Sequence, residues 1–513
     1  MFYSFFKKNY FWFFFLATTT NFLYSVDLYQ YIYDGHHHGY MITNAIDFMN
    51  GRLPYKEIFI QYGIVTTLVH SLSLKIISQN LISINIITCL LYSLTVLLIS
   101  LIISKKNTPI YGLLAILIIF FNHPIPWLPW SNYIAFFFLV LSFFLLLNST
   151  RKNIFFSGFF FSLSALSRES FFLIVSVIIL FNIIYLIYKK KIKLIIFLII
   201  GFLIPYIIFF IYLYYNNIFF DWINYFQLPK LYLNKYNLKI YQAILQGGLY
   251  IFFGTWFDIL YNPQNIIISI IAIINCLFIV NQFFLKKSKV DYYLLIISFV
   301  ALILVIISIS TEIFRLYTSV IIGIVTALSF IFDFKNKENK MIVSFLLIFI
   351  SIYSIYFFPK GNQKQFERLN IINFVENANL NYFKYQKWPE SDWVILNQID
   401  NITKSVKKNC NIKYGLNYTF DGFYYLILDL QMLQLAPAVT EDQNFLFNTF
   451  EKKFEKNIIS NIKNNNLIII TNGHFKEKFK MENYKTVNLY KDKNNIYRDV
   501  IYISFPKKCW KSI

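Results

Sequence analysis

The residues best suited to chemistry stand together near the start of this sequence. Asp34 is followed, after one glycine, by the triplet His36, His37 and His38. A carboxylate can take a proton from a hydroxyl group or coordinate a divalent ion, and imidazoles bind metal when neutral and phosphate when protonated. Because three consecutive side chains cannot all point the same way, at most two of the histidines can share a site with Asp34. The alternative is that the triplet is solvated and idle in an exposed loop.

Arg168 and Glu169 form a second charged group. They follow the apolar run Ile154–Leu166, which is short for a membrane span, so the pair could lie below the outer surface, within the membrane. A charge at the centre of a membrane helix costs roughly 2.5–3.5 kcal/mol, and such residues usually pair with each other or face an aqueous cavity. Arg168 is therefore a candidate to hold an anionic group such as a lipid phosphate, and a structural ion pair is the alternative.

Glu312 and Arg315 form a third group, just before Tyr317 at the outer end of another apolar run. Charged residues at such a position commonly anchor a helix at the interface. The functional alternative is that Arg315 is a second phosphate-binding cation.

The amino-acid composition indicates whether these residues belong to a soluble protein or to a membrane protein. The chain is 57% hydrophobic and only 14% charged, whereas about a quarter of a soluble domain is charged. The formal net charge of +21 would suggest nucleic acid on a soluble protein. Here, no nucleic-acid motif is present, and Lys and Arg gather in short loops between apolar runs, as they do in membrane proteins. The composition therefore predicts an integral membrane protein that contacts membrane lipid and no nucleic acid.

About eleven apolar runs approach the roughly 20 residues that a membrane-spanning helix needs. The basic clusters between them fall in alternate loops, which predicts that these loops and the N-terminus are cytoplasmic and that the chain after Pro359 is outside. Two more apolar stretches, Gly63–Gln79 and Tyr241–Leu260, are interpreted as helices at the outer interface. The predicted spans are Tyr10–Val26, Leu81–Ser104, Pro109–Phe121, Tyr133–Asn148, Ile154–Leu166, Ser170–Tyr188, Leu194–Tyr214, Gln264–Leu285, Val290–Ser310, Tyr317–Phe332 and Met341–Phe358.

This topology divides the chain into two domains. Residues 1–358 are expected to form the membrane domain, with a first outer loop over 27–62 and a long outer loop over 215–263. Residues 360–513 are expected to form a soluble extracytoplasmic domain. Its predicted strands, Leu467–Thr471 and Val500–Phe505, and an amphipathic stretch near Phe447–Ile462 indicate an α/β fold. Outside the cytoplasm a disulfide between Cys410 and Cys509 is permitted, and the sequence leaves their pairing open.

The first outer loop resembles that of a known family. Asp34 comes soon after the first span, and an amphipathic helix is predicted over Gly39–Met49. The chain then reads Gly51-Arg52-Leu53-Pro54-Tyr55-Lys56-Glu57-Ile58-Phe59 and Gln61-Tyr62-Gly63. This arrangement is similar to the GT-C glycosyltransferases, which are polytopic enzymes that use polyprenyl-phosphate-linked sugars, and is nearest to bacterial transferases of the dolichyl-phosphate-mannose or family 39 type. The layout covers most of the membrane region, and the specific motifs cover about Tyr33–Gly63, with weaker support at Ser167–Ser170 and Arg315–Tyr317.

The resemblance implies an inverting sugar transfer with Asp34 as the general base on an acceptor hydroxyl. It implies phosphate-binding cations and gives sugar recognition to loop aromatics such as Tyr55 and Trp222. Many relatives carry a second acid directly after the first, where this chain has Gly35. The candidate substrate-binding residues are His36, His37, Arg52, Tyr55, Glu57, Arg168, Glu169 and Arg315, and Asp34 and His37 are candidate ligands of a divalent cation, the one cofactor that the sequence leaves open.

The donor implied by the resemblance is a polyprenyl-phosphate sugar, and the acceptor is a cell-envelope glycan, lipid or protein. The protein would be a multi-pass protein of the inner (plasma) membrane. A transporter or flippase of lipid-linked sugar would use the same cations without Asp34 as a base. An O-antigen ligase-like enzyme would carry its key residues in a late outer loop, and a membrane scaffold would tolerate free replacement of Asp34 and Arg168.

Overall fold

The computed structural model describes most of both predicted domains. The described residues are 2–60, 63–122, 126, 128–225, 242, 245, 249, 264–285, 291–309, 316–332, parts of 341–352, 374–377, 379–433, 436, 452–472, 481–489 and 501–510. Glu312, Arg315 and most of the long outer loop lie outside the described residues.

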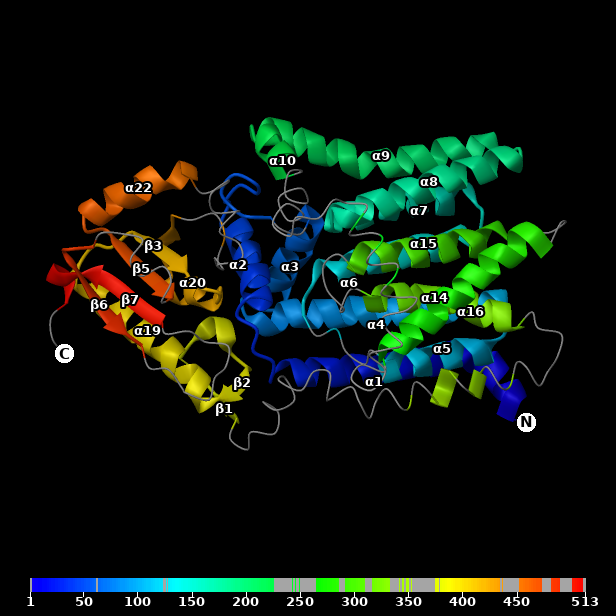
Figure 1. Ribbon diagram of the computed structural model, residues 1–513, viewed down its shortest axis with the longest axis horizontal. Coiled ribbons are helices and arrows are strands. Elements are labelled where there is room, and N and C mark those ends of the chain that lie inside the picture. Colours follow the sequence, from blue (N-terminus) through cyan, green and yellow to red (C-terminus); the bar gives the residue numbers. More distant parts are fainter. Residues whose placement is uncertain are drawn as a thin grey trace.

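Long apolar helices run side by side and form one bundle (Figure 1). Each predicted span up to residue 332 is a helix, and the last predicted span is described only in part. By length and composition, three of the described helices (α4, α8 and α9) are long and apolar enough to cross a membrane. The bundle helices are α1 (Phe2–Tyr29), α4 (Leu81–Lys106), α5 (Pro109–Asn122), α6 (Ser131–Leu146), α7 (Arg151–Ser167), α8 (Ser170–Tyr188), α9 (Ile192–Tyr215), α14 (Gln264–Val280, continued by a π-helical turn over Asn281–Leu285), α15 (Tyr292–Ile309) and α16 (Leu316–Phe332).

Basic residues gather at one end of this bundle, as the alternating loops predicted. Lys106, the last residue of α4, lies 3.2 Å from the carboxylate of Asp291 at the start of α15. Arg151, the first residue of α7, lies over the ring of Phe197 near the start of α9. The first contact joins the ends of α4 and α15, and the second joins the starts of α7 and α9.

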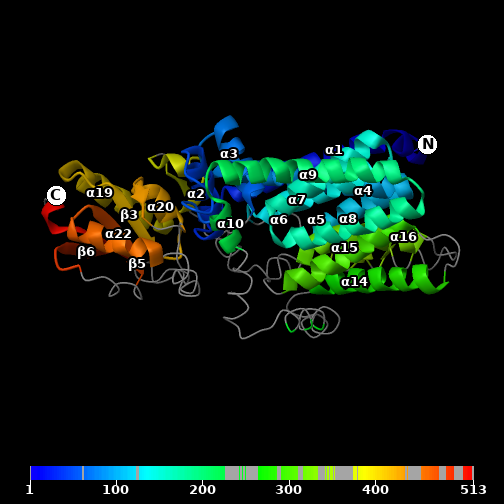
Figure 2. The ribbon, with the colours of Figure 1, turned by 90° about the horizontal axis from the view of Figure 1, so that it is seen from above.

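The opposite end of the bundle carries three shorter helices. These are α2 (His37–Met49), α3 (Ile64–Ile76) and α10 (Phe219–Tyr225). Helix α2 lies between the bundle and the C-terminal domain in both ribbon views (Figures 1 and 2). Met41 and Ala45 on its predicted apolar face are buried. The sequence therefore predicted this helix correctly, except that it begins two residues earlier than Gly39, at His37.

The C-terminal domain is built on a mixed five-stranded sheet with the order β4-β3-β5-β7-β6. Strand β3 runs parallel to β4 and β5, and β7 runs antiparallel to β5 and β6. Strand β5 confirms the prediction for Leu467–Thr471, and β7 confirms the second predicted strand. The sheet strands are β3 (Tyr414–Tyr418), β4 (Gln431–Met432), β5 (Leu467–Asn472), β6 (Tyr484–Asn488) and β7 (Ile501–Pro506), and a separate pair is formed by β1 (Phe374–Glu376) and β2 (Lys387–Pro389).

Helices cover both faces of this sheet (Figure 1). They are α19 (Glu390–Asn409) on one face and α22 (Lys452–Lys463) on the other, and a short helix α20 (Phe423–Leu428) follows β3. Side chains of β5 alternate between the two faces, because successive residues of a strand point to opposite sides. Leu467 and Ile469 pack with Ile458 of α22, and Ile468 and Ile470 belong to the core that contains α19. The domain is therefore the α/β layer structure expected from the sequence.

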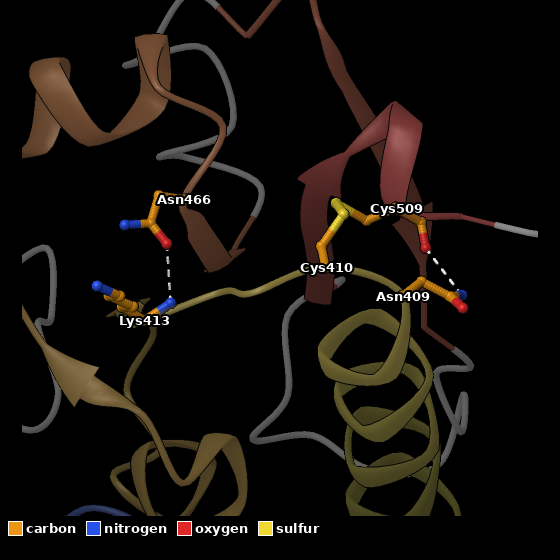
Figure 3. Close-up of a disulfide and its surroundings, with 5 residues drawn as sticks. All are labelled: Asn409, Cys410, Lys413, Asn466 and Cys509. Atoms are coloured by element: carbon orange, nitrogen blue, oxygen red, sulfur yellow. Dashed lines mark hydrogen bonds between the residues drawn. A yellow bond between two sulfur atoms is a disulfide. The ribbon is translucent and has the colours of Figure 1, made fainter.

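A disulfide between Cys410 and Cys509 closes this domain at the end of α19 (Figure 3). The two Cα atoms are 5.5 Å apart, and the amide of Asn409 donates to the Cys509 carbonyl at 3.1 Å. The bond ties the helix to the 3₁₀ turn Lys507–Cys509 that follows β7. The structure thus pairs the two cysteines whose pairing the sequence left open.

Candidate active site

Asp34 and His37 form a hydrogen-bonded pair at the start of α2. One Asp34 carboxylate oxygen accepts the backbone N–H of His37 at 2.8 Å, and the other lies 2.9 Å from the His37 ring Nδ1. The Asp34 backbone carbonyl also accepts the N–H of His38 at 3.2 Å. The carboxylate therefore caps the first turn of α2 and orients one imidazole. Both side chains remain partly accessible, at 17% for Asp34 and 20% for His37.

The surroundings of Asp34 keep its carboxyl group ionised. Burial by itself raises the pKa of this carboxyl, but the charge of His37 and its hydrogen bond lower it, and the neighbouring imidazoles add to the lowering. The net effect holds the pKa of Asp34 below its usual range. At neutral pH the group is therefore a carboxylate that can accept a hydrogen bond or a proton.

The three histidines point to three different places. His37 faces Asp34, whereas the ring of His36 stacks on Phe420 of the C-terminal domain with 4.4 Å between ring centroids. His38 is fully buried beside the ring of Tyr29. The expectation that at most two histidines share a site with Asp34 agrees with this arrangement. The alternative of three solvated histidines is wrong, because His36 is only 8% exposed and His38 is 0% exposed.

Burial also sets the charge of two of these histidines. Removal from water lowers the pKa of His36 to about 3 and that of His38 to about 4. A buried imidazole resists protonation because the charged form is the one that loses hydration. His36 and His38 are therefore neutral at physiological pH and do not supply a positive charge for phosphate binding.

Arg168 lies in the turn between α7 and α8 and is only 6% exposed. Its Nε donates to the Ser170 hydroxyl at 3.0 Å, and its Nη1 donates to the Ser131 hydroxyl at 3.0 Å. Ser131 directly follows Trp130, whose ring meets the edge of His37 at 5.0 Å between centroids. The start of α6 therefore connects the Arg168 turn to the Asp34–His37 pair. Arg168 is thus held inside the protein by two serine hydroxyls.

The end of the first loop also docks on the α7–α8 turn. The backbone N–H of Gly63 donates to the Glu169 carboxylate at 3.4 Å, and the Thr66 hydroxyl donates to the Ser167 carbonyl at 2.8 Å. A Cβ at position 63 would overlap the Leu166 carbonyl oxygen, so only glycine allows this approach. The structure thus brings Glu169 against the Gly63 end of the first loop.

The Gly-Arg-Leu-Pro-Tyr segment is a tight turn that buries Tyr55. Tyr55 has a φ of +66°, a left-handed conformation that is uncommon outside glycine, and its N–H donates to the Ile58 carbonyl at 3.0 Å. Its ring packs edge-on against Tyr225 of α10 at 5.1 Å and near Phe209 of α9. Trp222 also packs on Phe209. Tyr55 and Trp222 are thus joined through one aromatic cluster beside the site.

Arg52 and Glu57, two other candidates in this loop, have different surroundings. Arg52 forms an ion pair with Asp47 at 2.8 Å and also donates to the hydroxyl of Tyr425 in the C-terminal domain. Glu57 is exposed, and its carboxylate accepts the N–H of Leu53 at 2.7 Å, which closes the turn. Within the described residues, Arg52 therefore contacts the C-terminal domain, and Glu57 supports the loop backbone.

Several residues of this site were not identified from the sequence. They are Trp130, Phe420, Asp421, Gly422 and Tyr425, which contact the first loop from α6 or from the C-terminal domain. The only local signal is the Asp421-Gly422 dipeptide after a buried strand, and by itself it indicates a turn. Their role depends on contacts that no local pattern encodes.

The described residues do not fit a metal centre. They contain no group of three His, Cys, Asp or Glu side chains that could hold an ion. Asp34 and His37, the two candidate ligands, are bonded to each other. Divalent ions such as Mg²⁺ need several oxygen ligands around them. The reaction proposed for these residues therefore contains no metal-dependent step.

No protein-family model matches this chain, and no curated protein matches its sequence. Its structure is similar to that of ArnT from Cupriavidus metallidurans bound to undecaprenyl phosphate, with a TM-score of 0.57 and 9% identity over 96% of this chain and 97% of that chain. It is also similar to the archaeal oligosaccharyltransferase AglB from Archaeoglobus fulgidus in complex with an inhibitory peptide and a dolichol-phosphate. In that case the TM-score is 0.50 and the identity 12%, over 92% of this chain and 70% of that chain. These likenesses confirm the predicted fold, because both proteins share with this chain a bundle of apolar helices followed by a C-terminal domain.

Proposed function

We propose that this protein is a membrane glycosyltransferase that moves a sugar from a polyprenyl-phosphate donor to a hydroxyl group of a cell-envelope acceptor. The observation that carries the proposal is the ionised Asp34, held by His37 at one end of a GT-C bundle. The likeness to a structure bound to undecaprenyl phosphate supports the choice of donor.

In the proposed reaction Asp34 is the general base. The acceptor hydroxyl attacks the anomeric carbon of the sugar, a new carbon–oxygen bond forms, and the hydroxyl proton passes to an Asp34 oxygen. The bond between the anomeric carbon and the phosphate oxygen breaks, and its electron pair leaves with the lipid phosphate. Because the pKa of Asp34 is low, the carboxylate is a weak base and takes the proton only when bond formation has made the hydroxyl acidic.

His37 and Arg168 are given supporting roles. His37 fixes the direction of the Asp34 carboxylate and favours its charged form. Arg168 would stabilise the charge that develops on the departing phosphate, since a preorganised cation is most effective in a site with little water. Phosphate is already a good leaving group, so no general acid is needed on the donor side. The nearby Tyr55 and Glu169 are proposed to line the donor side, and Arg315 stays a candidate cation.

The site is proposed to face the outside of the inner membrane. Basic residues gather at the bundle end opposite to α2, as expected for a cytoplasmic side. The disulfide between Cys410 and Cys509 supports an oxidising compartment for the C-terminal domain. In this orientation residues 1–358 form the membrane domain, and residues 360–513 form the extracytoplasmic domain.

Single-turnover transfer tests the proposal. Membranes that contain the protein are mixed with a panel of polyprenyl-phosphate sugars and a cell-envelope acceptor extract, and wild type is compared with Asp34→Asn. Asp27→Asn is a matched control, because Asp27 is an exposed carboxylate only seven positions earlier. We expect Asp34→Asn to lose at least about 10²-fold in rate and Asp27→Asn to stay near wild type.

The other outcomes separate the alternatives. Equal transfer by wild type and Asp34→Asn would show that Asp34 is not the base. Absence of transfer together with movement of labelled lipid across the bilayer would instead identify a flippase.

A further inference from the structure

The C-terminal domain touches the catalytic loop directly, at the residues on either side of Asp34. The contact is made by residues 419–422, which connect β3 to α20 and are called the docking turn below. The docking turn contacts Tyr33 and Gly35, the immediate neighbours of Asp34. These two segments are separated by 388 positions in the sequence.

Asp421 is the central residue of the docking turn. Its side chain is only 8% exposed. One carboxylate oxygen accepts the backbone N–H of Phe423 at 2.9 Å, and the other accepts the hydroxyl of Tyr33. A Cβ at position 35 would overlap this carboxylate. The Asp421 carboxylate therefore fills the space beside Gly35 where a side chain would otherwise stand.

Backbone contacts reinforce this position. The N–H of Gly422 donates to the Gly35 carbonyl at 2.7 Å. A Cβ at Gly39, on the first turns of α2, would lie 2.7 Å from the Gly422 Cα. The two backbones thus meet without intervening side chains, so a small movement of the docking turn must move the loop that carries Asp34.

Further contacts extend the interface along both sides of Asp34. The ring of Phe420 stacks on His36, and the indole N–H of Trp388 donates to the Ile32 carbonyl at 3.1 Å. Near the far end of α2, the hydroxyl of Tyr425 donates to the carboxylate of Asp47. The C-terminal domain therefore holds α2 near both of its ends, and it holds the Asp34 loop most closely through Asp421.

We propose that Asp421 is a positioning residue for the reaction, and that the docking turn of the C-terminal domain sets the orientation of the Asp34–His37 pair. Asp421 acts through Tyr33 and Gly35 and touches no reacting atom. The inference rests on the proposed function for its activity readout, while its structural readout is independent of that function.

The activity test compares Asp421→Asn with a matched control. Asp429→Asn changes another carboxylate of the same domain, at the far end of α20, where the side chain is 77% exposed and the φ of +44° is one that Asn accepts readily. We expect Asp421→Asn to lower kcat by about ten- to a hundredfold through misplacement of the base, with KM for both substrates unchanged within about twofold. Tyr33→Phe should lower kcat similarly, and the double variant should be no worse than the more damaging single variant, because both changes break one interaction.

Hydrogen exchange provides the second readout. The His37 N–H is protected by its bond to the Asp34 carboxylate, and the Gly422 N–H by its bond to Gly35. Asp421→Asn should speed exchange at both amides and leave the amides of β5 unchanged, whereas Asp429→Asn should alter neither. If exchange in β5 also rises, the domain has been destabilised as a whole. Tyr33→Phe, which removes a single hydroxyl, then decides the question.

The outcomes separate this inference from the proposed function. Unchanged exchange in the loop would overturn it, as would faster exchange with unchanged kcat, or fully additive effects of Tyr33→Phe and Asp421→Asn. If the wild-type protein transfers no sugar, the proposed function fails. The exchange data alone then test the positioning: faster exchange at His37 in Asp421→Asn supports it, and unchanged exchange overturns it.

Discussion

Removal of the His37 imidazole should shift the pH dependence of the reaction. His37→Ala deletes the ring that lies 2.9 Å from one Asp34 oxygen but keeps the backbone N–H that donates to the other at 2.8 Å. A hydrogen bond to a charged group contributes about 1.5–3 kcal/mol, and one pKa unit corresponds to about 1.36 kcal/mol. The pKa of Asp34 should therefore rise by about 1–2 units.

The direction of this change in the Asp34 pKa follows from the surroundings of the carboxyl group in the folded protein. Burial raises the pKa of the Asp34 carboxyl, and the His37 ring lowers it, so removal of the ring leaves a higher pKa than in the wild type. The wild-type carboxylate stays ionised far into the acid range and loses its charge only as the pH falls through its depressed pKa. In the variant, protonation begins at higher pH. The acid limb of kcat/KM should therefore move upward by the same 1–2 units or so.

The assay is a pH–rate profile of sugar transfer from about pH 2 to pH 8, on wild type, His37→Ala and His37→Gln. Glutamine keeps a neutral donor but cannot carry a positive charge, so its acid limb should lie between those of the other two proteins. Identical acid limbs in all three proteins would refute the reasoning, because they would show that His37 does not control the ionisation of Asp34. A downward shift in His37→Ala would refute it as well.

Two further variants test the fold around the site. Cys509→Ser removes the disulfide and should destabilise the C-terminal domain by about 2–5 kcal/mol, since the bond closes a long loop. Calorimetry should therefore show a lower unfolding temperature. Cys276→Ser, at a free and partly exposed thiol, should leave the unfolding temperature unchanged. Gly63→Ala should lower thermal stability markedly, because a Cβ at position 63 would overlap backbone atoms. Gly51→Ala should lower the free energy of unfolding by only about 1 kcal/mol, because a Cβ at position 51 meets open space and only the φ of +82° is strained. Equal unfolding temperatures for the two glycine variants would contradict the close approach at Gly63.

The helix bundle could be predicted from sequence because its signal is local. An apolar run of sufficient length specifies a membrane helix whatever its neighbours are, so the predicted span Leu81–Ser104 differs from α4 by only two residues at its end. The same holds for α2, where Met41 and Ala45 mark the buried face. Asp34 could be selected as a candidate because it stands in a recognisable order with the first span and with this helix.

The partners of the site residues could not be predicted, because they come from distant parts of the chain. The family resemblance makes Arg52 a candidate for binding substrate phosphate, and the structure pairs it with Asp47 and Tyr425. His36, a candidate substrate-binding residue, lies beside the His37 ring, and its own ring stacks on Phe420. Charge and ring type indicate what a residue can do, but only the tertiary fold decides which neighbour it meets.

The position of Asp421 has a consequence for how the protein is made. Membrane helices enter the bilayer as the ribosome delivers them, so the loop with Asp34 emerges long before the residue that steadies it. Until the C-terminal domain has been synthesised and folded, Tyr33 has no hydrogen-bond acceptor from that domain, and the docking turn does not cover Gly35. Given the positioning role proposed for Asp421, we expect the Asp34 loop to be incomplete in a nascent or truncated chain, and we expect transfer activity only once the C-terminal domain is in place.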